Sequence, residues 1–142
     1  MSTELHPAVT AALRQWHHMV AQADFSDLPA MTRSDVVFRS PAVYKPYHTA
    51  PVLHLILNTV MQIFEDFTYH REFISADGLS VVLEFSARVG DRELKGIDMI
   101  RFDGTGKISE FEVMIRPLSG LQALAAAMGT RIGAALGAGT SA

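Results

Sequence analysis

The first half of the chain carries apolar residues at the spacing of helices. Within residues 7–23 they recur every three or four positions, which places them on one helical face. We expect a short second helix over residues 28–31 and a third over 50–64, where apolar side chains occupy most sides. Residues 35–39 predict a short strand. Residues 40–49 contain two prolines and two tyrosines and predict a loop at the rim of a cavity.

The second half changes to alternation of apolar and polar positions, which is typical of strands. Turn signals such as Asp77-Gly78 and Gly90-Asp91 separate the runs, so consecutive strands are expected to pair as hairpins. A last helix is predicted over residues 118–136 and a disordered tail over 137–142. The four expected strands are residues 67–73, 79–89, 92–103 and 107–116.

Strict alternation also assigns side chains to the two faces of the sheet. In the first run it places Tyr69 and Arg71 on the same face. In the last run it places Ile108 and Phe111 on opposite faces.

Helices followed by a meander predict an α+β fold, in which the N-terminal helices cover one face of an antiparallel sheet. The 142 residues, 49% of them hydrophobic, suit one domain, which we place at residues 1–136. The net charge of -3 without blocks of either sign favours neither nucleic acid nor a membrane surface as a partner. The start of the chain lacks a signal-peptide pattern, and no apolar stretch of about 20 residues occurs.

The inventory of reactive residues narrows the chemistry. Cysteine is absent, which excludes disulfides and thiolate metal sites and suits a cytoplasmic location. We find no phosphate-binding or dinucleotide-binding glycine pattern and no HExxH spacing, so we expect no cofactor and no metal.

Local sequence adds a family resemblance to this picture. The run from Gly96 to Ile108 (GIDMIRFDGTGKI), together with residues 21–24 (AQAD) and 35–41 (DVVFRSP), resembles the nuclear-transport-factor-2-like superfamily over residues 7–117. That superfamily includes SnoaL-like polyketide cyclases and ketosteroid isomerases. The resemblance implies that the sheet curves into a cone-shaped half barrel around the N-terminal helices, with the last helix added to it. It also implies a pocket for a small hydrophobic molecule.

Asp98 is the foremost candidate for chemistry. It shares its strand parity with Gly96, Ile100 and Phe102, which predicts that it points into the apolar interior. Burial disfavours the charged form of a carboxyl group, so we expect a raised pKa and a neutral hydrogen-bond donor. By resemblance, Asp98 matches the protonated oxyanion-hole aspartate of the isomerases. The alternative is a buried carboxyl group with a purely structural role.

Two further candidates rest on the resemblance. Trp16 matches the place of the isomerases' second oxyanion donor, a tyrosine, although it could equally be a core residue. Ser40 stands where the isomerases carry their general-base aspartate. A serine hydroxyl cannot abstract a carbon-bound proton unaided. Ser40 could instead be a loop residue that bonds to backbone before Pro41.

A base could come from the rim of the predicted cavity. His48 and His54 lie at the junction of the loop and the third helix, and His54 is our tentative catalytic choice. His54 could also be an ordinary core histidine. The expected ligand-binding residues are Trp16, Ser40, Tyr44, His48, Phe85, Asp98, Phe111, Val113 and Ile115.

The opposite sheet face carries charged side chains together with Met99 and Met114, which predicts a homodimer contact. Three functions therefore stay open. The chain could be a cyclase or isomerase that acts on a carbonyl compound, with Asp98 stabilising an enolate. It could be a non-catalytic binder of a hydrophobic metabolite, or an accessory dimerisation domain.

Overall fold

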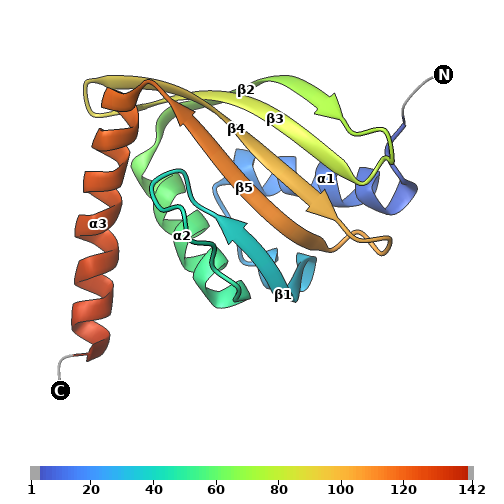
Figure 1. Cartoon of the computed structure of the whole chain (residues 1–142), viewed down its shortest axis with the longest axis horizontal. Coiled ribbons are helices and arrows are strands. Elements are labelled where there is room, and N and C mark those ends of the chain that lie inside the picture. Colours follow the sequence, from blue (N-terminus) through green and yellow to red (C-terminus); the bar gives the residue numbers. More distant parts are fainter. Residues whose placement is uncertain (1–3, 141–142) are drawn as a thin grey trace.

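The computed structural model describes residues 4–140, with side chains described up to residue 132. Within this range three α-helices and a short 3-10 helix pack around a five-stranded sheet (Figure 1). The elements in chain order are α1 (Pro7–Gln22), η1 (Leu28–Met31), β1 (Thr32–Arg39), α2 (Ala50–Ile63), β2 (Glu65–Ile74), β3 (Ser80–Val89), β4 (Arg92–Phe102), β5 (Ile108–Arg116) and α3 (Leu118–Thr140).

The sheet confirms the predicted α+β class. Its strand order is β1-β5-β4-β3-β2, and β2 to β5 form the expected antiparallel meander. β1 adds to the far edge, parallel to β5, so the sheet is mixed where the sequence predicted an antiparallel one. The reason is the connection: the chain passes through α2 and the whole meander before β5 reaches β1. Figure 1 shows the sheet curving over α1 and α2.

Bulges correct the predicted alternation in two strands. β2 gains a residue between Tyr69, which pairs with Phe85, and Glu72, which pairs with Leu83. Arg71 therefore turns to the outer face, where its Nε donates to Glu84 at 2.8 Å, while Tyr69 stays inside. In β5, an extra residue at Ser109 lets both Ile108 and Phe111 point inward, and both are fully buried.

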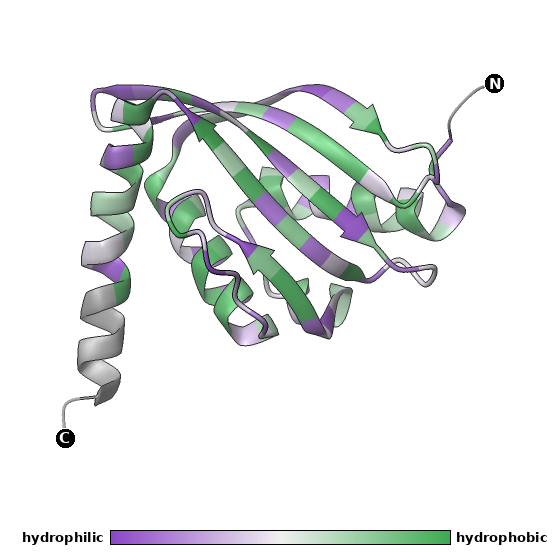
Figure 2. Cartoon of the chain, in the orientation of Figure 1, coloured by the Kyte–Doolittle hydropathy of each residue, from purple (hydrophilic) through white to green (hydrophobic). Residues whose placement is uncertain are grey.

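The main core lies between α1, α2 and the concave face of the sheet. α1 begins at Pro7 with the ring of His6 accepting a hydrogen bond from the Ala8 N–H, and it buries Val9, Leu13 and Trp16. Figure 2 shows the matching pattern in the strands, where hydrophobic and hydrophilic positions alternate along β3 to β5. Each large apolar side chain buried in this way contributes about 1.5–3 kcal/mol of transfer free energy.

Helix α3 packs beside α2 and against the end of the meander (Figure 1). Leu124 is its buried anchor and belongs to a second cluster with Ile63, Phe85 and Leu94. The helix continues to Thr140, into the segment 137–142 that the sequence assigns to a tail. Residues 141–142 lie outside the described residues. No described helix is both long and apolar enough to cross a bilayer.

The outer sheet face carries cross-strand ion pairs. Glu84 is 7% exposed and accepts from Arg71, while the Lys95 ammonium lies 3.4 Å away. The hydrogen bond from Arg71 is the main reason that the pKa of Glu84 falls to about 2. Met114 is 46% exposed on the same face. The dimer contact proposed for this face stays a prediction.

Gly96 gives a test of this packing. A Cβ at Gly96 would lie 2.5 Å from the carbonyl oxygen of Met114 and 2.7 Å from Cζ of Phe85. Because the backbone cannot yield, we expect Gly96→Ala to lower the free energy of unfolding by about 1–3 kcal/mol in urea denaturation. Gly104→Ala is the control, since a Cβ there meets no described atom within 4 Å. Equal effects of the two substitutions would contradict the packing.

Candidate functional site

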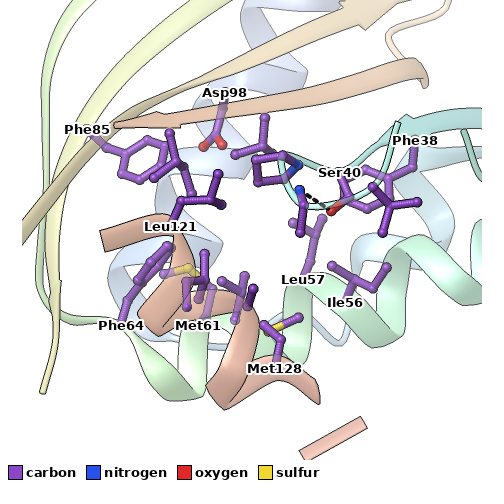
Figure 3. A pocket seen from close by; sticks show the side chains of 18 of the residues that line it. Phe38, Ser40, Ile56, Leu57, Met61, Phe64, Phe85, Asp98, Leu121 and Met128 are labelled. Carbon is purple, nitrogen blue, oxygen red and sulfur yellow. Dashed lines mark hydrogen bonds between the residues drawn. The ribbon is translucent and has the colours of Figure 1, made fainter. Parts of the chain in front are cut away.

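A cavity of about 260 Å³ opens between the concave sheet face, α1, α2, α3 and the loop after β1. Most of its walls are apolar, and Figure 3 shows Phe64, Phe85, Leu121 and Met128 around the hollow. The volume is slightly below the range of about 300–1,000 Å³ that is typical of pockets for small ligands. The cavity therefore suits a compact, mainly apolar molecule.

Asp98 is the acidic side chain among the described lining residues. It lies on β4, is 7% exposed, and turns its carboxyl group into the hollow (Figure 3). Its Oδ2 accepts a hydrogen bond of 2.6 Å from the Tyr69 hydroxyl, and that hydroxyl accepts one of 3.0 Å from Trp16 Nε1. Within the described residues no such partner is found for Oδ1. The second oxygen of Asp98 is thus free to meet a ligand.

The surroundings decide the protonation of this group. Burial raises the pKa of Asp98 to about 7, although the hydrogen bond from Tyr69 opposes the rise. Burial and the adjacent carboxyl group also raise the pKa of Tyr69, so the phenol keeps its proton. Because Tyr69 donates to Oδ2, the neutral acid can carry its own proton on Oδ1 and donate it to a ligand. The pair then presents a hydrogen-bond donor inside an apolar space.

Aromatic contacts hold the donors in place. The Trp16 ring packs against Phe25 and Phe111, with centroid distances of 5.7 and 5.4 Å. Tyr69 meets the edge of Phe67 at 4.9 Å. β2 is irregular both before Tyr69, between Glu65 and Thr68, and after it, and Tyr69 pairs directly with Phe85 on the inner face. The orientation of Tyr69, the partner of Asp98, therefore depends on side chains from α1 and from strands β2, β3 and β5.

The structure brings six of the predicted site residues together in the cavity wall. Asp98 and Trp16 lie there as expected, and Ser40 contributes its hydroxyl oxygen, which accepts from the Ala42 N–H at 3.1 Å. The other predicted residues in the wall are Phe85, Val113 and Ile115.

Four predicted site residues do not line the cavity. Tyr44 is fully exposed and His48 is also exposed, because the loop turns both side chains to solvent. His54 faces β1, where its Nε2 lies 3.3 Å from Thr32 Oγ1, and burial lowers its pKa. Phe111 is fully buried behind Trp16. None of these four can reach a molecule in the cavity without a rearrangement.

Two features of the site were missed by sequence reasoning. Tyr69 stood in an alternating run without a sign that it would meet Asp98. Only the pairing of β2 with β3 and of β3 with β4 brings the two together. The other is α3, which supplies Leu121, Met128 and Ile132 to the wall. Its apolar face was visible in the sequence, but not the element it would cover.

The described cavity wall offers no second carboxyl group and no histidine. Its titratable side chains are Tyr47, Tyr69 and Asp98. Among the residues with described placement, no cluster of three or more histidine and acidic side chains could hold a metal ion. The site therefore combines one weak acid with apolar contacts.

Solved structures reveal the relatives of this chain. A steroid delta-isomerase from Pseudomonas aeruginosa is 59% identical, with a TM-score of 0.92, and the match covers 95% of this chain and 98% of that one. An uncharacterized protein with a cystatin-like fold from Silicibacter pomeroyi is 32% identical, with a TM-score of 0.79, over 89% and 86% of the two chains. No protein-family model and no curated protein matches.

A third structure, an NTF2-like protein of unknown function from Mesorhizobium loti, shares the fold. It has a TM-score of 0.70 at 11% identity, over 82% of this chain and 98% of that one. The helices and the curved, mixed sheet define the class of protein, an α+β fold, and these matches confirm that fold. The chain belongs to the nuclear-transport-factor-2-like superfamily and is similar to its ketosteroid-isomerase-like members.

Tyr69→Phe tests the hydrogen-bonded relay, in which Trp16 Nε1 donates to the Tyr69 hydroxyl and that hydroxyl donates to Asp98 Oδ2. The substitution keeps the ring but leaves the Trp16 N–H and Asp98 without their partner, so we expect a loss of about 1–3 kcal/mol in the free energy of unfolding. Tyr47→Phe is the control, because the described residues give its hydroxyl no partner; we expect a change below about 0.5 kcal/mol. Similar losses in both variants, measured by urea denaturation, would show that the relay contributes nothing.

Asp98→Asn tests the raised pKa. Between about pH 4 and 7 the unfolded chain loses the Asp98 proton while the folded chain keeps it, so the wild type loses stability as the pH rises. The asparagine variant has no carboxyl group at this position, so its stability lacks this dependence on pH. We expect its stability relative to the wild type to rise across that window, by at most about 4 kcal/mol, and to level off above it.

The comparison with Asp98→Asn cancels the opposite pH dependence that His54 adds, since both proteins contain it. Asp91→Asn, at an exposed turn, serves as the control for a lost carboxyl group. A stability difference between the wild type and Asp98→Asn that stays constant from about pH 4 to 8 would mean an ordinary pKa for Asp98.

Proposed function

We propose that this chain binds a small, mainly apolar carbonyl compound and stabilises its enol or enolate form in an isomerisation or cyclisation. The observation that carries the proposal is the buried Asp98 carboxyl group, bonded to Tyr69 through Oδ2 and free at Oδ1 in an apolar cavity. A carbonyl oxygen placed at Oδ1 would accept a hydrogen bond from the neutral acid.

Such a donor acts on the reaction and not only on binding. The hydrogen bond strengthens as negative charge develops on the substrate oxygen, because the walls around Asp98 are mostly apolar and the donor is already in place. In other enzymes, loss of one oxyanion donor lowers kcat by roughly 10²–10³-fold. Tyr69 contributes indirectly, since it fixes Oδ2 and leaves the outer oxygen to the substrate.

Similarity to the Pseudomonas aeruginosa protein, which carries the name steroid delta-isomerase, supports this class of reaction. By the sequence resemblance, Ser40 stands at the position of the isomerases' general base, so we do not propose their two-carboxylate mechanism for this chain. In this chain Asp98 would stabilise the enolate oxygen, and water in the open cavity would take the proton from the carbon beside the carbonyl group, since the described wall has no second carboxyl group and no histidine.

A non-catalytic binder is the second candidate. The lack of a second carboxyl group or histidine in the described wall favours it, since a binder needs only one polar anchor. An accessory dimerisation domain with a filled interior fits less well, because the cavity stays open at about 260 Å³.

Trp16 provides the measurement, because it is the single tryptophan of the chain and lies in the cavity wall. We expect isophorone, a compact monoketone, to change its fluorescence on binding. Affinity should be constant at low pH and fall about tenfold per pH unit above the pKa of Asp98, as the donor proton is lost. Asp98→Asn should bind more weakly and without this pH dependence.

Deuterium exchange at the carbon atoms beside the isophorone carbonyl separates the two candidates. An enzyme accelerates the exchange, and Asp98→Ala should lower that rate by about 10²-fold or more. Binding that depends on Asp98 without faster exchange would favour the binder. Wild-type affinity that is the same from about pH 5 to 9 would contradict both.

A further inference from the structure

We propose that the ligand is a compact apolar molecule with two acceptor oxygens, one held by Asp98 and the other by the Ser40 hydroxyl. This inference rests on the proposed function and adds the class of ligand. Ser40 and Asp98 come from different parts of the fold, the loop after β1 and strand β4, and both contribute to the wall of the same cavity (Figure 3).

The hydrogen bonding of Ser40 leaves its proton available. The hydroxyl oxygen already accepts from the Ala42 N–H at 3.1 Å, the bond drawn as a dashed line in Figure 3. A serine hydroxyl carries one donor hydrogen, and among the described residues no acceptor lies in reach of it. When a ligand displaces water from the cavity, this hydrogen needs an acceptor on the ligand.

Ser40 is also held in position. The loop that carries it is closed by the backbone pair of Phe38 and Tyr47, with N–H to oxygen distances of 2.8 and 2.9 Å. The two rings stack with centroids 6.1 Å apart. Pro41 follows Ser40 directly and restricts its backbone. The loop therefore restricts the position of the Ser40 hydroxyl before a ligand binds, which lowers the entropy cost of binding.

The space between the two polar groups selects for an apolar body. Val113 and Ile115 of β5 and Leu57 of α2 contribute to the wall, and the volume of about 260 Å³ admits a compact ligand. Tyr69 and Trp16 use their hydrogens within the relay, so the hydroxyl donors left in the described wall are those of Ser40 and Tyr47, and Ser40→Ala tests which of them holds the second oxygen. With a one-acceptor ligand the half-buried Ser40 hydroxyl stays bonded to water, whereas a ligand with two acceptors satisfies both donors.

A matched pair of probes tests the inference. Ketoisophorone is isophorone with a second carbonyl group across the ring, so the two differ in little else. Affinity for each is measured from Trp16 fluorescence at a pH below the pKa of Asp98, for the wild type, Ser40→Ala and Ser40→Thr. We expect Ser40→Ala to weaken ketoisophorone binding by about two- to tenfold and to leave isophorone unchanged.

Ser40→Thr keeps a hydroxyl group and should restore most of the ketoisophorone affinity. Camphor and camphorquinone, whose second carbonyl group is adjacent to the first, form a pair with a different oxygen spacing. If Ser40→Ala weakens neither dione selectively, the inference is overturned, while Asp98-dependent binding of isophorone would leave the proposed function standing. If no probe binds in an Asp98-dependent way, the proposed function fails and the inference fails with it.

Discussion

The hydrogen bond between Tyr69 and Asp98, made inside an apolar cavity, is the interaction on which the site depends. A carboxyl group in such a space is costly to ionise, so the protein keeps it neutral up to a pH of about 7 and bonds one of its oxygens. That arrangement needs three elements. Helix α1 supplies Trp16, the alternation of β4 points the Asp98 side chain to the inner face, and the bulged β2 keeps Tyr69 on the same face. The remaining oxygen is then the polar point at which a ligand can be held.

Much of this could be predicted from the sequence. The spacing of apolar residues predicted each helix and strand, although not its exact ends. Asp98 shares its strand face with Ile100 and Phe102, which predicted that its side chain points inward. The bulges could not be predicted, because an inserted residue leaves no mark in an alternating pattern. For that reason the alternation put Arg71 on the same face as Tyr69, whereas the two side chains lie on opposite faces.

Sequence reasoning was weakest for the loop and the last helix. Tyr44 and His48 belong to the loop and face solvent, whereas Ser40 at its start reaches the cavity. Composition predicts a loop but not which of its side chains turn inward, since that depends on the backbone pair of Phe38 and Tyr47.

The titration of the Asp98 carboxyl carbon by carbon-13 NMR tests the account most directly, with the signal assigned by its absence in Asp98→Asn. We expect Asp98 to titrate with a midpoint near pH 7, because the effect of burial on its pKa outweighs that of the hydrogen bond from Tyr69. A midpoint near the ordinary value of 3.8 would contradict it, since the cavity would then present a carboxylate and no donor at neutral pH.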